Sequence, residues 1–165
     1  MKYIIEGRGY IEQNGHREYF KNHFVGNGLE ALANTAENGA YIIGTSLTYN
    51  YYFSQPWFLN NLDIGTNQST PTTFNTSGNT SSVQPFYSLS FSISTATNGS
   101  QVISIVIVNY QVSSFPAITI GEMSLYTSNF GYISRTSVAD GDFSPFSYNP
   151  ANALAVVWQI VLGFQ

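Results

Sequence analysis

Residues 86–95 carry a strict alternation of apolar and hydroxyl side chains. Single serines separate the apolar members, which are Tyr87, Leu89, Phe91 and Ile93. Successive side chains of a β-strand point to opposite faces of the sheet, so the pattern predicts a strand with one buried face and one hydroxyl-covered face. A sheet with one face on a core and one toward solvent is typical of antiparallel folds.

Similar extended runs cover much of the remaining chain and predict eight or nine strands. Residues 101–112 are apolar on both faces and are expected to be central, and residues 154–164 form an apolar terminal strand that must be paired inside the sheet. The other runs are residues 41–43, 47–53, 57–64, 118–126 and 131–138. Short strands at this spacing predict one mainly all-β domain over residues 1–165, an antiparallel β-sandwich of jelly-roll-like type.

The first part of the chain, residues 1–38, is expected to form a hairpin and then one short helix. Asn14-Gly15 stands between two β-favouring runs, and both residues tolerate the positive φ of a two-residue hairpin turn. Apolar residues then recur at helical spacing within residues 27–37. The glycines of Gly7-Arg8-Gly9 are interpreted as turn residues.

The middle of the chain is unusual for its polarity and its lack of charge. Residues 65–85 consist almost entirely of Thr, Asn, Ser, Gly and Pro, which predicts a long surface loop. Residues 64–121 contain no Asp, Glu, Lys or Arg. Charged side chains commonly protect sheet edges from pairing with another chain. The charge-free span therefore indicates edges that are occupied, and another copy of the chain is the expected occupant.

The charge balance argues against nucleic acid as a partner, and the hydropathy argues against a membrane span. Only 8% of the residues are charged and the net charge is −4, whereas phosphate binding requires clustered Lys and Arg. The longest apolar run, residues 102–108, is far shorter than the roughly 20 residues of a membrane-spanning helix. The chain has no cysteine, which excludes disulfides and thiolate metal sites.

Few residues could carry catalysis or bind a metal ion. His16 and His23 are the only neutral-pH bases, and Glu12 and Glu18 lie near them in the sequence. A metal or acid–base site of His and Glu is conceivable, but nothing else in the chain supplies a further ligand at a recognisable spacing. Asp140-Gly141-Asp142 could hold Ca²⁺, although calcium needs about six to eight oxygen ligands and such a motif is usually a turn. No hydrolase serine motif or phosphate loop is present. We therefore expect no catalytic residue, no cofactor and no metal, and a protein that is not an enzyme.

Three residues are expected to have structural roles. Trp158 lies in the middle of the terminal strand and is expected to anchor the core. Glu122 and Arg135 are the only charged residues between positions 64 and 139. A two-residue turn at residues 128–129 would place them directly opposite each other as a partly buried ion pair. The alternative is that both point to solvent, where such a pair contributes little.

Four sites match the acceptor pattern for N-glycosylation, in which Asn is followed two residues later by Ser or Thr. They begin at Asn67, Asn75, Asn79 and Asn98. Chance matches are expected in a chain so rich in these residues. The first three fall in the predicted polar loop, where an attached sugar would be exposed, and the sequence leaves their modification open.

Several short motifs follow one another from about residue 20 to the end of the chain. They are residues 25–33, a short glycine-containing helix; residues 62–72, a strand and Thr/Pro-rich loop; residues 120–126, a strand with Glu122; residues 133–136; and residues 154–160. Their order resembles that in small tail, fibre or surface-appendage proteins of phages and archaeal viruses. The resemblance implies a β-sandwich component of the virus particle with no catalytic residues to transfer.

The function expected from the sequence is that of a virion structural protein acting through self-assembly. It would form part of the capsid surface, a turret, a tail or a fibre, and its partners would be copies of itself and other virion proteins. The alternative is a carbohydrate-binding or host-attachment β-sandwich module that binds host-surface glycans. The residues that would stack on sugar rings in that module are Trp57, Tyr49, Tyr51 and Tyr52.

Overall fold

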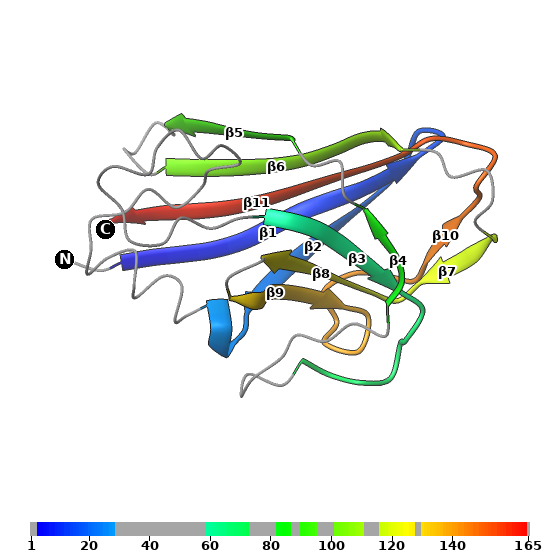
Figure 1. Ribbon diagram of the computed structural model, residues 1–165, viewed down its shortest axis with the longest axis horizontal. Helices are drawn as coiled ribbons and strands as arrows, with labels where there is room; N and C mark the ends of the chain where they lie inside the picture. Colours follow the sequence, from blue (N-terminus) through cyan, green and yellow to red (C-terminus); the bar gives the residue numbers. More distant parts are fainter. Residues whose placement is uncertain are drawn as a thin grey trace.

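The computed structural model describes residues 3–28, 59–72, 82–86, 90–95, 101–110, 116–127 and 130–164. This part of the chain is built almost entirely from β-strands (Figure 1), and every strand pair is antiparallel. The expected all-β antiparallel class is therefore confirmed. Among the described residues helix is found only at 26–28, and the rest of the predicted helix lies outside them.

Nine of the strands form one sheet, in the order β4-β3-β8-β9-β2-β1-β11-β6-β5, and β10 and β7 form a second, small one. The strands are β1 (Tyr3–Gln13), β2 (His16–Phe24), β3 (Leu59–Gly65), β4 (Ser82–Phe86), β5 (Ser90–Thr95), β6 (Gln101–Tyr110), β7 (Ile118–Ile120), β8 (Glu122–Thr127), β9 (Gly131–Ser137), β10 (Phe146–Tyr148) and β11 (Leu154–Phe164).

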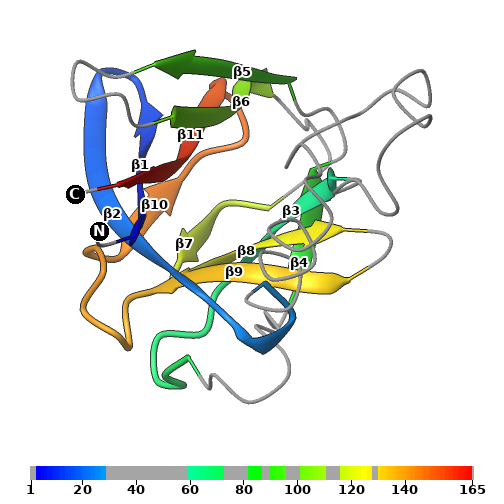
Figure 2. The same ribbon diagram turned by 90° about the vertical axis from the view of Figure 1, so that its left-hand side faces the viewer.

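The large sheet curls so strongly that its two halves face each other. Figure 2 shows β1, β11, β6 and β5 on one side and β8, β9, β3 and β4 on the other, with β2 crossing between them. The register explains this course, because β2 pairs with β1 up to Asn22 and then with β9 through His23 and Phe24. The expected sandwich is thus made by one continuous sheet, and its core lies between the two halves.

Several predicted strands appear with changed boundaries. The apolar terminal strand is β11, which is paired on both sides as expected. Gly121 divides the single strand expected at residues 118–126 into β7 and β8. The prediction of a polar loop over residues 65–85 was wrong for its last part, because residues 82–85 belong to β4, which pairs with β3. Pro85 fits there because β4 is an edge strand, where a missing N–H is tolerated. The runs at 41–43 and 47–53 lie outside the described residues.

The core is filled by side chains from both halves of the sheet. Trp158 and Ile160 of β11 are buried together with Phe20 of β2 and with Leu125 and Ile133 of the opposite half. Trp158 is 1% exposed and is among the largest fully buried side chains. Its expected place in the core is therefore confirmed.

Gly7 and Gly9 lie inside β1, so their interpretation as turn residues was wrong. A Cβ atom at Gly9 would stand 2.4 Å from the Phe20 ring and 2.2 Å from the carbonyl oxygen of Val157. At Gly7 it would overlap the side chain of Asn22. Both glycines therefore leave room for side chains of β2 at the place where that strand leaves one half of the sheet for the other.

The Asn22 side chain uses this room to join three strands. In the amide orientation that satisfies its neighbours, Oδ1 accepts hydrogen bonds from the Trp158 indole (3.1 Å) and the Arg8 backbone (2.9 Å), and Nδ2 donates to Ser134 Oγ (3.0 Å). The predicted hairpin turn is also confirmed, with φ of 53° at Asn14 and 75° at Gly15.

Candidate functional site

A buried ion pair lies on β8 and β9, on the face of the sheet that points away from the core. Arg135 Nη2 is 2.6 Å from Glu122 Oε2, and the two side chains are 3% and 1% exposed. The predicted pairing and burial are confirmed, whereas the predicted register was wrong. Glu122 stands opposite Ser137 and Arg135 opposite Ser124, so the ion pair is diagonal. There are two reasons: the ladder closes at Thr127 and Gly131, which makes the turn one residue longer than predicted, and a β-bulge between Leu125 and Tyr126 shifts the register by one more residue.

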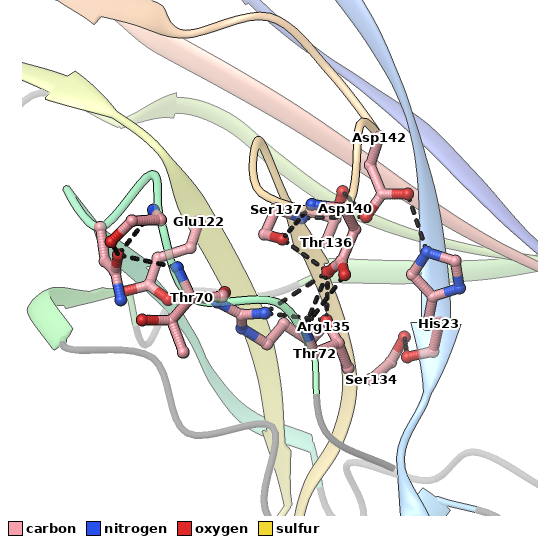
Figure 3. A network of polar contacts seen from close by, with 12 residues as sticks. His23, Thr70, Thr72, Glu122, Ser134, Arg135, Thr136, Ser137, Asp140 and Asp142 are labelled. Atoms are coloured by element: carbon pink, nitrogen blue, oxygen red, sulfur yellow. Dashed lines mark hydrogen bonds and ion pairs between the residues drawn. The ribbon is translucent and has the colours of Figure 1, made fainter.

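Arg135 also holds the segment that covers this face. Its Nη2 donates to the carbonyl oxygen of Thr70 (3.0 Å), and Nη1 donates to Thr72 Oγ1 (2.8 Å) and approaches Asp140 Oδ2 (3.5 Å). Figure 3 shows the guanidinium between Glu122, Thr70, Thr72 and Asp140. One buried charge thereby connects residues 66–72, which follow β3, to the loop after β9.

Asp140 is the acceptor at the centre of these contacts. It receives hydrogen bonds from the Thr72 backbone (3.0 Å), from Thr72 Oγ1 (2.5 Å) and from Ser137 Oγ (2.5 Å). Burial by itself would raise the pKa of the carboxyl group, but the bonds from Ser137 and Thr72 and the charge of Arg135 outweigh it and lower the pKa below 3.8. Asp140 therefore stays ionised and bound at neutral pH.

Asp142 connects the same loop to β2. Its Oδ1 is 2.8 Å from His23 Nε2, and its Oδ2 accepts from the backbone N–H of Ser137 at 3.0 Å. Because an ionised carboxylate only accepts, the Nε2 atom of His23 carries the proton in this contact. Gly141 between the two aspartates has φ of 75°, which agrees with the interpretation of Asp140-Gly141-Asp142 as a turn.

The network offers three groups that could in principle hold a cation. Ligand atoms of His23, Asp140 and Asp142 lie within 4.8 Å of one another. Both carboxylates are already bound by protein donors, His23 presents an N–H to Asp142, and Arg135 carries a positive charge at Asp140. A cation would have to displace these contacts. The Ser137 hydroxyl is likewise occupied, since it donates to Asp140 and accepts from the Asp140 backbone.

The two histidines do not form a common site. His16 begins β2 and His23 lies near its end, which separates them by about 20 Å along an extended strand. His16 stacks on Phe146 with ring centroids 5.3 Å apart. Glu12 forms an ion pair with Arg17 at 2.5 Å, and Glu18 accepts from the Ser144 backbone at 2.8 Å. The histidines and glutamates that suggested an acid–base or metal site in the sequence therefore make separate contacts.

Another buried carboxylate, Asp63 of β3, accepts a hydrogen bond from the Tyr132 hydroxyl of β9. Burial and this contact with Asp63 raise the pKa of Tyr132 above its ordinary value. The Tyr132 ring meets Tyr126 edge-on at 5.1 Å. These contacts join β3, β8 and β9 and extend the polar layer on the outer face.

An exposed aromatic surface lies on the β1–β2 hairpin, and sequence reasoning missed it. Tyr19 is 66% exposed and is the only large apolar side chain at such exposure in the part of the chain that the structure describes. The Arg17 guanidinium lies 4.0 Å from the Tyr10 ring centroid and 5.9 Å from that of Tyr19. Strand alternation places these side chains on one face, which was readable from the sequence.

Other predicted residues cannot be placed. The stacking residues Trp57, Tyr49, Tyr51 and Tyr52 lie outside the described residues, as do three of the four glycosylation patterns. Within the described chain no helix has the length and apolar character that crossing a membrane requires.

Comparisons with protein-family models, with curated proteins and with solved structures find no match to this chain.

Proposed function

We propose that this protein is a non-enzymatic structural subunit that assembles with copies of itself, as a component of a virus particle. The observation that carries the proposal is the uncharged edge strand β5 of an open sheet. The proposed place in a virus particle rests on the resemblance of the sequence to small virion proteins.

Strand β5 has β6 as its only neighbour among the strands that the structure describes. Neither strand contains a charged residue. An edge strand exposes a row of backbone N–H and C=O groups that can pair with another chain, and charges or proline are the usual means of preventing this. An uncharged edge of this kind supports strand pairing between copies.

The polar network supports a structural role over a catalytic one. Arg135, Glu122, Asp140 and Asp142 all have protein partners within hydrogen-bond or ion-pair distance. Groups held in this way stabilise a rigid subunit, whereas catalysis requires groups that are free to meet a substrate. The network fixes residues 66–72 and the loop after β9 on the outside of the sheet, and a subunit that repeats in an assembly needs such a defined surface.

The proposal is tested by sedimentation of the full chain at several concentrations, with a variant of the edge. Ser92→Lys places a charge in the middle of β5, in the row that continues through Ser104 and Gln159 to the exposed Arg8. We expect the wild type to associate and Ser92→Lys to shift the equilibrium toward monomer. Thr119→Lys, at an exposed position of β7, is the matched control and should associate like wild type. A wild-type chain that stays monomeric at all concentrations would contradict the proposal.

A carbohydrate-binding module is the second candidate, and the exposed Tyr19 ring favours it. Exposed tyrosine rings beside charged hydrogen-bonding groups can stack on sugar rings, and Arg17 contacts both Tyr19 and Glu12. A rise in melting temperature with added neutral oligosaccharide that is lost in Tyr19→Ser would support this candidate. No shift with wild type would contradict it.

A further inference from the structure

One of the four glycosylation patterns lies in a described and exposed part of the molecule. The segment Asn67-Gln68-Ser69 follows β3 on the outer side of the sheet. Gln68 and Ser69 are exposed and Asn67 is half-buried. The acceptor residue is therefore reachable from solvent together with the hydroxyl residue that its pattern requires.

The amide of Asn67 is held by its oxygen. Oδ1 accepts hydrogen bonds from the Ser69 backbone (2.9 Å), from Ser69 Oγ (3.2 Å) and from the Thr70 backbone (3.2 Å). No residue in the described part of the chain accepts a hydrogen bond from Nδ2. The nitrogen that would receive a sugar is thus unoccupied, and the Ser69 hydroxyl contacts the same amide.

The sheet fixes the backbone of this segment on both sides of Ser69. A Cβ atom at Gly121 would stand 2.5 Å from the carbonyl oxygen of Asn67, so the segment packs directly on the backbone between β7 and β8. Arg135 binds the carbonyl oxygen of Thr70 at 3.0 Å. The half-exposed side chain of Asn67 therefore stands on an anchored backbone, and a group attached to it would displace none of the buried contacts.

We propose that Asn67 is a site of N-glycosylation by a sugar diphosphate donor. The Asn67 Nδ2 atom forms a bond to C1 of the sugar, the bond between C1 and the diphosphate oxygen breaks, and the diphosphate leaves with the electron pair. Nδ2 loses one proton, so the amide becomes a sugar-substituted amide and nothing is oxidised or reduced. The donor is either a nucleotide-linked single sugar or a lipid-linked oligosaccharide, and the mass of the added group distinguishes them.

The composition gives this modification a physical purpose. With 8% charged residues, the chain lacks the charged surface that usually keeps a protein soluble. A glycan is bulky and strongly hydrated. At Asn67 it would hydrate the outer face of β8 and β9, which the uncharged segment 66–72 covers.

The test is mass spectrometry of the full chain isolated from its natural source. Trypsin has no cleavage site between Lys21 and Arg135, so chymotrypsin is the suitable protease. Cleavage after Leu62 and Phe74 releases residues 63–74, which contain Asn67 and none of the other three acceptor sites. We expect this peptide to carry a sugar. A peptide 63–74 found only at its unmodified mass would overturn the proposal.

Variants of the full chain made in the same cells identify the site independently. Asn67→Gln and Ser69→Ala should lose the modification, whereas Ser69→Thr, which keeps the hydroxyl group, should retain it. Asn152→Gln, outside any acceptor pattern, is the control and should leave the added mass unchanged. A modified peptide 63–74 in Ser69→Ala, with the melting temperature of wild type, would contradict N-glycosylation at Asn67 and indicate another attachment.

Discussion

Phe20 and Trp158 pack against each other although a whole strand lies between them. Their ring centroids are 5.1 Å apart, while β2 and β11 stand on opposite sides of β1, about 10 Å from each other. The register places both residues opposite Gly9. Because Gly9 has no side chain, the two rings meet over its backbone and join three strands into one packed row.

We expect Gly9→Ala to destabilise the protein strongly. The added Cβ would meet the Phe20 ring and also the Val157 carbonyl oxygen, and the second contact cannot be relieved by a side-chain rotation. Overpacking of a core costs about 1–3 kcal/mol, and we expect the upper end of that range. Denaturant unfolding measures the loss. Gly15→Ala is the control, since a Cβ there meets nothing within 4 Å and only its φ of 75° adds strain. Equal losses in the two variants would contradict this packing.

Trp158→Ala should lower the free energy of unfolding by about 3–5 kcal/mol. The ring is 1% exposed and its indole nitrogen donates to Asn22, so the substitution leaves a cavity and removes one of the two hydrogen bonds that Asn22 Oδ1 accepts. Trp158→Phe keeps most of the apolar contact and loses only the donor, and we expect a smaller loss from it. An unchanged midpoint of urea unfolding in Trp158→Ala would rule out the anchoring role.

The all-β class, the hairpin turn and the place of the terminal strand were predictable because each rests on local periodicity. The alternation of side chains along β5 and β11 predicts strands, and Asn14-Gly15 predicts a turn because both residues tolerate a positive φ. The curl of the sheet was not predictable in this way. It depends on glycines whose neighbours come from other strands, so Gly7 and Gly9 looked like turn residues until β2 and β11 were placed beside them.

The polar network shows the same division between local and long-range signals. Scarcity of charge correctly suggested that Glu122 and Arg135 meet, since a buried charge needs a partner. The register depended on two local features, a turn one residue longer than expected and a β-bulge between Leu125 and Tyr126, and together they changed a direct pair into a diagonal one. The contacts of Arg135 with Thr70 and Thr72 join segments 63 to 65 residues apart and have no sequence signal.

Acid should weaken the protein through Asp140. Its folded pKa is lowered below 3.8, so its ionised form contributes stability that is fully present above the unfolded pKa of about 3.9 and is lost as pH falls through the folded pKa. We expect Asp140→Asn to be less stable than wild type at pH 7, with a difference that shrinks below about pH 4. Urea unfolding across this range measures it. Glu6→Gln on the exposed side of β1 is the control, and a pH-independent difference for Asp140→Asn would contradict the linkage.

The ion pair of Glu122 and Arg135 should show strong energetic coupling. Both side chains are almost completely buried, and breaking such a pair by removing one partner costs about 3–5 kcal/mol. Arg135→Met removes the cation from Glu122 and should approach that loss, whereas Glu122→Gln leaves Arg135 beside Asp140 at 3.5 Å and should cost less. The double variant removes both charges, and its loss should fall short of the sum by at least about 1 kcal/mol. The Arg17–Glu12 pair on the exposed hairpin is the matched control, where coupling should stay below about 1 kcal/mol because solvent screens the charges. Strict additivity at Glu122 and Arg135 would mean that the protein gains nothing from their contact, and the network would then depend on Asp140 alone.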